Sequence, residues 1–288
     1  MKTRDLTNAA ILSDKTINVQ ASEGKNYLLF LLSILFFFLA AFTGSQTTNQ
    51  DGLREITDDA FTVGEHLNYD VYYGPIVAGS ATIAVPSYEN YGDRECYRLE
   101  FTMRSAKFFD IFFKVRDSYY SLMDVRGLFP WKFEQHTREG GYKKDFVAWF
   151  DQKNHTAKTN EGGPYDIKPY TQDIISTFFY ARTLDYDMLK TGEEVHFSNF
   201  YENKVYPLDV KFLGEENVQT KAGKFHCQKI EPIIVKGGLF RNTGKILIWI
   251  THDSLKVPVK VQTQVVIGSV SAELASYSGL AGTLTAKF

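Results

Sequence analysis

The residue types that most often carry out chemistry are scattered along this chain. None of its histidines lies within helical metal-ligand reach of another, the six being His66, His136, His155, His196, His226 and His252. The sequence contains no Gly-x-Ser-x-Gly, His-Glu-x-x-His, paired Cys-x-x-Cys or glycine-rich phosphate-binding motif. These patterns predict solvated strand histidines, with no metal site, no cofactor and no catalytic residues.

One segment combines charge with a dense apolar surface. Residues 107–115 read KFFDIFFKV, in which four phenylalanines surround Asp110, namely Phe108, Phe109, Phe112 and Phe113. One interpretation is a bend that packs into the core. The other is an apolar lip at the mouth of a barrel, where it meets lipid or an apolar ligand.

A second segment, residues 171–184, loses the two-residue period of its surroundings and predicts a helix. Thr171 or Asp173 is placed to cap the N-terminus of this helix, with Asp173 favoured, and Arg182 lies at its end, where the helix dipole favours a positive charge. A binding role for this pair would need other partners across a cavity.

The candidate ligand-binding residues are therefore the aromatic and charged side chains of these two segments and of one neighbouring strand. They are Phe108, Phe109, Phe112, Phe113, Phe178, Phe179, Asp173, Arg182 and Asp117.

Short alternating strands surround both segments. Leu67, Tyr69 and Val71 alternate with polar residues, and Gly74-Pro75 turns the chain into a second strand. About a dozen such strands predict an all-β fold, mainly antiparallel, in which a strongly curved sheet forms a barrel or half-barrel with one covering helix. The expected organisation is a leader at 1–45, a linker at 46–60, the curved sheet domain at 61–278 and a tail at 279–288.

An uncharged apolar run at residues 27–43 predicts delivery to a membrane. Its length, about 17 residues, is marginal for a span and suits either a cleaved signal peptide or a single anchor. Export to the periplasm or cell envelope follows from either alternative. Without residues 1–45 the chain carries 28 Lys and Arg against 31 Asp and Glu, a net charge near −3 that does not favour nucleic acid.

The two cysteines allow two alternatives. Cys96 and Cys227 form one disulfide in an oxidising compartment, or each is a small buried thiol within a strand.

Taken in order, a series of short motifs resembles the bacterial domain-of-unknown-function family 3108. The motifs are Phe61-x-x-Gly64-Glu65-x-Leu67-x-Tyr69, Ala78-Gly79, Phe109-Asp110, Asp117-x-Tyr119, Gln172-Asp173, Arg182, Gly223-x-Phe225-x-Cys227 and Trp249-Ile250-Thr251-x-Asp253. The resemblance covers residues 61–277 and implies an exported envelope protein without an assigned activity. The closing stretch also looks like the LolA and LolB type of lipoprotein carrier, whose half-barrel holds acyl chains, but this chain has no lipid-anchoring cysteine after the apolar run.

These observations favour a non-catalytic envelope protein that binds an apolar or amphiphilic ligand inside a curved sheet. The alternatives are an envelope assembly module that recruits other envelope proteins through sheet edges, and an outer-membrane β-barrel. An enzyme would need a cleft in which acidic and basic side chains such as Asp117, Asp173, Arg182 and Asp253 converge.

Overall fold

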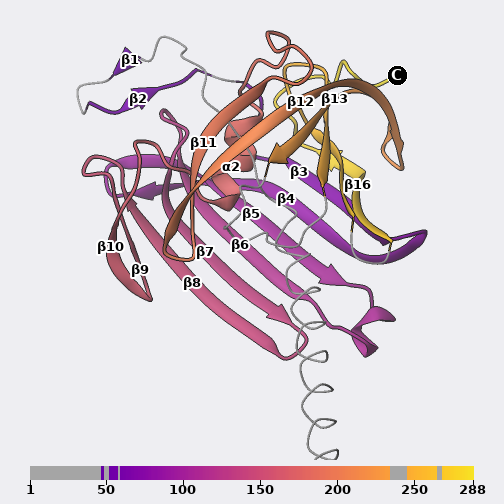
Figure 1. The fold of residues 1–288 in the computed structure, drawn as a ribbon, viewed down its shortest axis with the longest axis horizontal. Helices are drawn as coiled ribbons and strands as arrows, with labels where there is room; N and C mark the ends of the chain where they lie inside the picture. The colour runs from indigo at the N-terminus through magenta and orange to yellow at the C-terminus, as the bar shows by residue number, and fades with distance from the viewer. Residues whose placement is uncertain (1–46, 49–51, 58, 234–244, 265–267) are drawn as a thin grey trace, which may run out of the picture. The chain divides into compact units, whose positions relative to one another are not determined.

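Antiparallel strands make up most of the chain, as the alternation predicts. The computed structural model describes residues 47–48, 52–57, 59–233, 245–264 and 268–288, and the apolar run at 27–43 lies outside them. A 14-stranded antiparallel sheet forms the body, and a separate two-stranded ribbon precedes it (Figure 1). No helix within the described ranges is both long enough and apolar enough to cross a bilayer.

The strands fall into two meanders joined by a helix. The ribbon pairs β1 (Thr47–Thr48) with β2 (Arg54–Glu55). The first meander comprises β3 (His66–Tyr73), β4 (Ile76–Tyr91), β5 (Arg94–Ser105), β6 (Arg116–Asp124), β7 (Pro130–Glu139), β8 (Tyr142–Asp151), β9 (Thr156–Thr159) and β10 (Gly162–Asp166). The second comprises β11 (Glu194–Tyr201), β12 (Lys204–Thr220), β13 (Gly223–Ile233), β14 (Ile246–Thr251), β15 (Pro258–Gln264) and β16 (Ser269–Ser278).

The two meanders become one sheet because β16 pairs with β3. Each other strand of the sheet pairs with its neighbour in sequence, so β10 and β11 are left as the two edges and the sheet does not close. Figure 1 shows β11 and β12 crossing over the first meander in this view, and the helix contacts β5 and β6 of the first meander and β11 of the second. The predicted curved sheet of about a dozen strands is confirmed, with β9 and β10 as additional short strands.

The local alternation of side chains explains the hairpins. Leu67, Tyr69 and Val71 of β3 are buried, while the residues between them are more exposed. Gly74 has a φ of +56°, which the tight turn into β4 requires and which glycine adopts without strain.

The helix α2 (Ile174–Ala181) lies inside the curved sheet. All eight of its residues are buried, and it contacts β5, β6 and β11. Its sequence is largely apolar, and the side chains of Ser176 and Thr177 are buried and accept hydrogen bonds from protein groups, which is typical of a helix enclosed by protein. The helix therefore fills space that the sequence analysis left for a ligand.

The segment assigned to a linker is packed on the body where the structure describes it. Arg54 is buried, donates hydrogen bonds to the carbonyls of Gly127 and Leu128 at 2.7 and 2.9 Å, and lies over the ring of Tyr170 at 4.5 Å. Leu53 is also buried, against Cys96, Phe129 and Trp131. Arg54 thus anchors residues 52–57 by donating hydrogen bonds to carbonyl groups of the β6–β7 turn. The polar composition of the segment did not predict this role.

The cysteines and the C-terminal tail are also part of the packed body. Cys96 and Cys227 are buried free thiols, so the disulfide alternative is wrong for this structure. Burial raises the pKa of each thiol to about 12. Lys287 in the tail pairs with Phe225 of β13, next to the end of β14.

Candidate functional site

Exposed apolar side chains gather where three connections of the first meander meet. The β3–β4 turn, the β5–β6 connection and the β7–β8 turn share one end of the sheet, because alternate turns of a meander lie at the same end. The backbone links them: Ala106 N–H donates to Ala78 at 2.8 Å, and Gly140 N–H donates to Lys114 at 2.7 Å. We call the exposed apolar residues there the apolar tip, which comprises Tyr73, Ile76, Val77, Phe108, Ile111, Phe112 and Tyr142.

An ion pair lies beneath the centre of the apolar tip. A 3₁₀ turn, η1 (Phe109–Ile111), carries Asp110, whose carboxylate accepts hydrogen bonds from Arg116 at 2.6 Å and from Ser105 at 2.5 Å. These hydrogen bonds hold the pKa of Asp110 below its usual value. The loop thus directs its apolar residues outward while its one acid is neutralised from below.

The four predicted phenylalanines of this loop divide into two pairs. Phe108 and Phe112 are 65% and 73% exposed, with ring centroids 5.7 Å apart. Phe109 and Phe113 are half-buried, the latter lying against Gly140. A bend packed into the core therefore does not describe Phe108 or Phe112. Ile111, which the sequence analysis did not select, is the most exposed of the large apolar residues described, at 78%.

A buried pair of carboxyl groups lies close behind the tip. Asp117 follows the β5–β6 connection, Glu139 ends β7, and both side chains face the interior. Burial and the neighbouring Asp117 raise the pKa of Glu139 to about 9, and burial also raises the pKa of Asp117. The protonated Glu139 carboxyl group is then the donor in a hydrogen bond to Asp117.

The partner of Asp117 could have been found from the alternation of β7. Four residues of β7 are spaced by two positions, are all buried and therefore share the inward face, namely Phe133, Gln135, Thr137 and Glu139. The same parity brings Tyr119 of β6 to 3.4 Å from Thr137. The sequence analysis did not predict Glu139, because its position near Asp117 depends on the register between β6 and β7.

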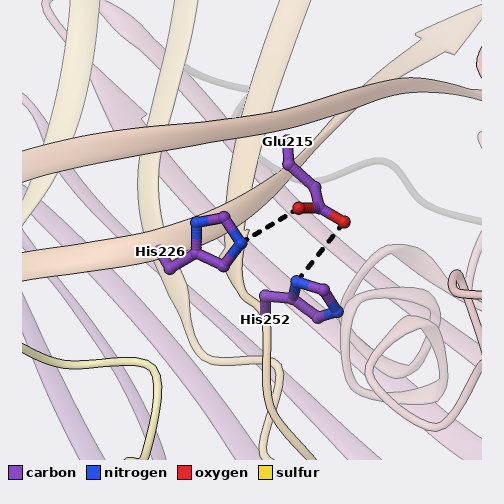
Figure 2. Close-up of side chains that lie close together, drawn as sticks. All are labelled: Glu215, His226 and His252. Atoms are coloured by element: carbon purple, nitrogen blue, oxygen red, sulfur yellow. Dashed lines mark hydrogen bonds and ion pairs between the residues drawn. The ribbon is translucent and has the colours of Figure 1, made fainter.

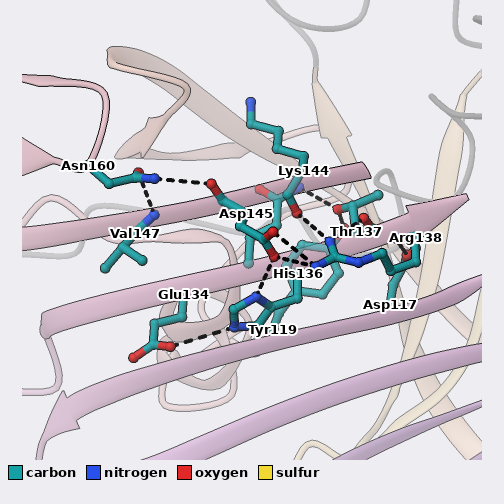
Figure 3. Close-up of polar contacts among 11 residues, drawn as sticks. Asp117, Tyr119, Glu134, His136, Thr137, Arg138, Lys144, Asp145, Val147 and Asn160 are labelled. Atoms are coloured by element: carbon teal, nitrogen blue, oxygen red, sulfur yellow. Dashed lines mark hydrogen bonds and ion pairs between the residues drawn. The ribbon is translucent and has the colours of Figure 1, made fainter. Parts of the chain in front are cut away.

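The outer face of the same strands carries a different, solvent-exposed network (Figure 3). Arg138 makes two hydrogen bonds to Asp145 at 2.7 and 2.9 Å, and the Nδ1 of His136 lies 2.7 Å from the same carboxylate. The Arg138 backbone N–H also donates to Asp117 at 2.8 Å, through the sheet to its inner face. This network ties β7 to β8 and thereby supports the β7–β8 turn of the tip.

Asp173 caps α2, as predicted. Its carboxylate accepts the N–H groups of Ile175 and Ser176 at 2.7 and 2.8 Å and the hydroxyl of Ser121 on β6 at 2.6 Å. Complete burial raises the pKa of Asp173 to about 6, although these hydrogen bonds oppose the shift. Asp173 thus joins the helix to the sheet and has its oxygen atoms occupied by protein donors.

Arg182 ends α2, as predicted, and its charge is compensated by a residue that the sequence analysis did not select. It makes two hydrogen bonds to Glu65 at 2.5 and 2.8 Å and donates to the carbonyls of Ala60 and Leu255 at 2.7 and 3.0 Å. The side chains of Arg182 and Glu65 are both almost completely buried. Arg182 therefore binds three separate segments of the chain together.

Phe178 and Phe179 are core residues and do not join the tip. Both are buried, and the ring of Phe179 contacts that of Phe61 at 4.9 Å. The structure therefore separates the nine predicted residues. The four phenylalanines of residues 107–115 form or support the tip loop, and Asp117 lies behind it. The other four residues belong to the helix or its ends and stabilise the interior, namely Asp173, Phe178, Phe179 and Arg182.

A pocket opens at the opposite end of the first meander. It has a volume of about 340 Å³ and is lined by Tyr91, Gly92, Asp93, Arg94, Trp131, Phe150, Asp151 and Lys153. Arg94 forms a buried ion pair with Asp124 at 2.7 Å, so its charge is already compensated. The stacked rings of Tyr91 and Trp131, 5.9 Å apart, line part of this pocket.

A solved structure shows that a similar fold occurs in another protein. A β-barrel-like protein of the domain of unknown function DUF1849 from Brucella abortus matches with a TM-score of 0.50 and 10% identity, over 76% of this chain and 98% of its own. An inferred exported protein with a YmcC-like fold from Bacteroides fragilis matches with a TM-score of 0.31 and 12% identity, over 76% and 97% of the two chains. An inferred lipoprotein from Parabacteroides distasonis matches with a TM-score of 0.28 and 12% identity, over 75% and 96%.

Sequence comparisons complete the assignment. A search of curated proteins found no match. Residues 68–275, which include the tip, the acid pair and α2, match a family profile over most of the chain. The chain therefore belongs to the family described as protein of unknown function, DUF3108.

Proposed function

We propose that this protein is an exported, non-catalytic component of the bacterial envelope that binds the surface of an anionic lipid bilayer through its apolar tip. The observation that carries the proposal is the exposure of Phe108, Ile111 and Phe112 on a loop whose one acid, Asp110, is paired with Arg116. Delivery to a membrane is supported by the apolar run at 27–43.

The exposure is unusual because the apolar side chains are adjacent and extended from the sheet. Single exposed apolar residues are common on soluble proteins, whereas clustered ones typically mark an interaction surface. Phe108 and Phe112 contact each other, and the connection that carries them is hydrogen-bonded to Ala78 near the start of β4, where Ile76 and Val77 are also exposed. The cluster thus spans two neighbouring connections.

Charge around the loop favours an anionic surface. Lys107 and Lys114 flank the phenylalanines and are exposed, whereas the one acid within the loop, Asp110, is paired with Arg116. Apolar side chains that enter the interface and basic side chains that remain at the head groups are the usual combination in peripheral membrane binding. Each basic residue near such a surface contributes about 1 kcal/mol.

The proposed position of the ligand differs from the interior site expected from the sequence. Phe178 and Phe179 pack against other core residues, Asp173 and Arg182 are hydrogen-bonded to protein groups, and α2 is buried on every residue. A lipid would have to displace these contacts to enter. At the tip it would displace only water.

Vesicle sedimentation tests the proposal. We would compare residues 46–288, which contain every described residue but lack the apolar run, with the double variant Ile111→Ser and Phe112→Ser. Fully burying one such side chain is worth about 1.5–3 kcal/mol, so two partly inserted side chains should supply about 2–4 kcal/mol together. The double variant should therefore partition roughly 30- to 700-fold less onto vesicles of phosphatidylglycerol and phosphatidylcholine.

Two controls distinguish vesicle binding through the tip from non-specific adsorption of the protein. Met188→Ser removes an exposed apolar residue that lies outside the tip and should leave partitioning unchanged. Lys107→Glu with Lys114→Glu should weaken binding to anionic vesicles much more than to neutral ones. Equal partitioning of the wild type and the Ile111 and Phe112 double variant, with native circular dichroism in both, would refute the proposal.

The alternative function, assembly through sheet edges, is less well supported. The edge strand β10 is five residues long, contains Pro164 and has an irregular register against β9. Part of the other edge, β11, is covered because Gln172 exchanges backbone hydrogen bonds with Ser198 and Phe200 at 2.9 and 2.8 Å. Short strands, proline and covered edges are features that oppose strand addition.

A further inference from the structure

Two histidines that are 26 positions apart in the sequence meet on the second meander (Figure 2). Glu215 lies on β12, His226 lies on β13, and His252 follows directly after β14. The β13–β14 ladder continues one residue past β14, because the His252 N–H donates to the His226 carbonyl at 2.9 Å. Three adjacent strands therefore present these side chains side by side.

The electron-pair donors of the three residues converge. The Nε2 of His226 lies 3.0 Å from one carboxylate oxygen of Glu215, and the Nδ1 of His252 lies 3.5 Å from the other. All three donor groups lie within 4.8 Å of one another. Ligands of a tetrahedral zinc ion, each about 2.0–2.2 Å from the metal, are roughly 3.3 Å apart, so small side-chain rotations would complete such a geometry.

The outer nitrogen of each imidazole is already held by a second acceptor. The Nδ1 of His226 lies 3.1 Å from the amide oxygen of Asn217, and the Nε2 of His252 lies 2.8 Å from the carboxylate of Asp187. Asp187 is fixed in turn by Gln228, which donates to the same oxygen at 2.6 Å. Histidine ligands of metal ions generally have an outer partner of this kind, which fixes the ring and its tautomer.

Each imidazole consequently lies between two acceptors. A neutral ring carries one N–H, and donating it to Asn217 or Asp187 leaves a lone pair that faces the lone pairs of Glu215. Protonating both rings would satisfy every acceptor, but it would place two cationic rings with their centroids only 5.2 Å apart beside Glu215 and Asp187. One divalent cation between the three donors satisfies all of them at once.

We propose that His226, His252 and Glu215 bind one divalent transition-metal ion such as Zn²⁺, with Asp187 and Asn217 as positioning residues. Two imidazoles and a carboxylate suit Zn²⁺, Cu²⁺ or Ni²⁺ better than Ca²⁺ or Mg²⁺. All three ligands are partly exposed, which leaves a coordination position open to water. The ion would fasten β12, β13 and β14 to the segment that carries Asp187.

Metal titration of the untagged full-length chain tests the site. After removal of bound metal, calorimetry with Zn²⁺ should show one equivalent bound at this site. His226→Ala and His252→Ala should each weaken this binding by about 100-fold or more, and Asp187→Asn by about 10-fold. His196→Ala is the matched control, because His196 is exposed and pairs with one carboxylate, Asp209 at 2.6 Å, without a second histidine.

Electron paramagnetic resonance with Cu²⁺ gives an independent readout that does not rely on an affinity. The nitrogen couplings should indicate two imidazoles in the wild type and one in either single variant. Failure of the wild type to take up one equivalent, or equal uptake by the double variant His226→Ala and His252→Ala, would overturn the proposal. So would a Cu²⁺ spectrum without two nitrogen ligands.

Discussion

The buried acid pair behind the tip should make the stability of the protein depend on pH in a way that one substitution removes. Asp117 and Glu139 are 4% and 2% exposed, and burial together with the Asp117 charge raises the pKa of Glu139 from 4.5 to about 9. Among the described residues, no permanent N–H or O–H group donates a hydrogen bond to the buried Oδ2 of Asp117. A proton on Glu139 supplies that donor, and Glu139→Gln replaces it with an amide.

The sign of the effect follows from proton binding. Between about pH 4.5 and pH 9 the folded protein keeps a proton on Glu139 that the unfolded chain releases, so folding takes up a proton. The stabilising contribution is complete below pH 4.5 and is lost as the pH rises through 9. Well inside that window the slope is the proton-linkage limit of about 1.4 kcal/mol per pH unit, so the loss between pH 6 and pH 8 is on the order of 3 kcal/mol.

Urea unfolding at pH 6, 7 and 8 measures this slope. Subtracting the pH dependence of Glu139→Gln from that of the wild type cancels the contributions of groups that do not interact with Glu139, and should leave about 1.4 kcal/mol per pH unit for the acid pair. Glu134→Gln is the control on the same strand, because the pKa of Glu134 is lowered by hydrogen bonding to Lys132 against the effect of burial. Parallel stability curves for the wild type and Glu139→Gln would refute the assignment of the proton.

Three further predictions concern the interior. Replacing Arg182 with Leu leaves the buried Glu65 without its partner and should lower the free energy of unfolding by about 3–5 kcal/mol, measured in urea; a loss below about 1 kcal/mol would contradict the role assigned to the pair. Asp173→Ala removes the cap of α2 and should cost about 1–2 kcal/mol in the same assay, whereas an unchanged midpoint would exclude a stabilising cap. Cys96 and Cys227 should react with a thiol reagent only after unfolding, because burial raises the pKa of both thiols to about 12; rapid reaction of the native protein would contradict their burial.

Features set by neighbouring residues could be predicted from the sequence. The β3–β4 hairpin follows from the alternation of Leu67, Tyr69 and Val71 and from the Gly74-Pro75 turn, and the structure has the turn at that position. The N-cap of α2 could be narrowed to Thr171 or Asp173, because a cap acts within three residues, and the structure has Asp173 at that position. The family could also be identified, from a series of motifs in the correct order.

Features set by the register between distant strands could not be predicted. Arg182 and Glu65 are separated by 117 positions, and no local pattern indicates that they meet. His226 and His252 become neighbours only because β13 pairs with β14 in a particular register. The burial of α2 likewise depends on how far the sheet curls around it, which the alternation of its strands does not determine.

The most direct test of the apolar tip is to measure its environment on a membrane. Cys96 and Cys227 are buried, so Ile111→Cys creates a site in the tip loop that an environment-sensitive fluorophore labels selectively. With anionic vesicles, the emission should shift to shorter wavelength and be quenched by lipids with brominated acyl chains. The same label at Lys153→Cys, in the β8–β9 turn at the other end of the meander, should not respond. Emission at Ile111→Cys that stays unchanged and unquenched under conditions where the protein sediments with vesicles would contradict membrane binding through the tip.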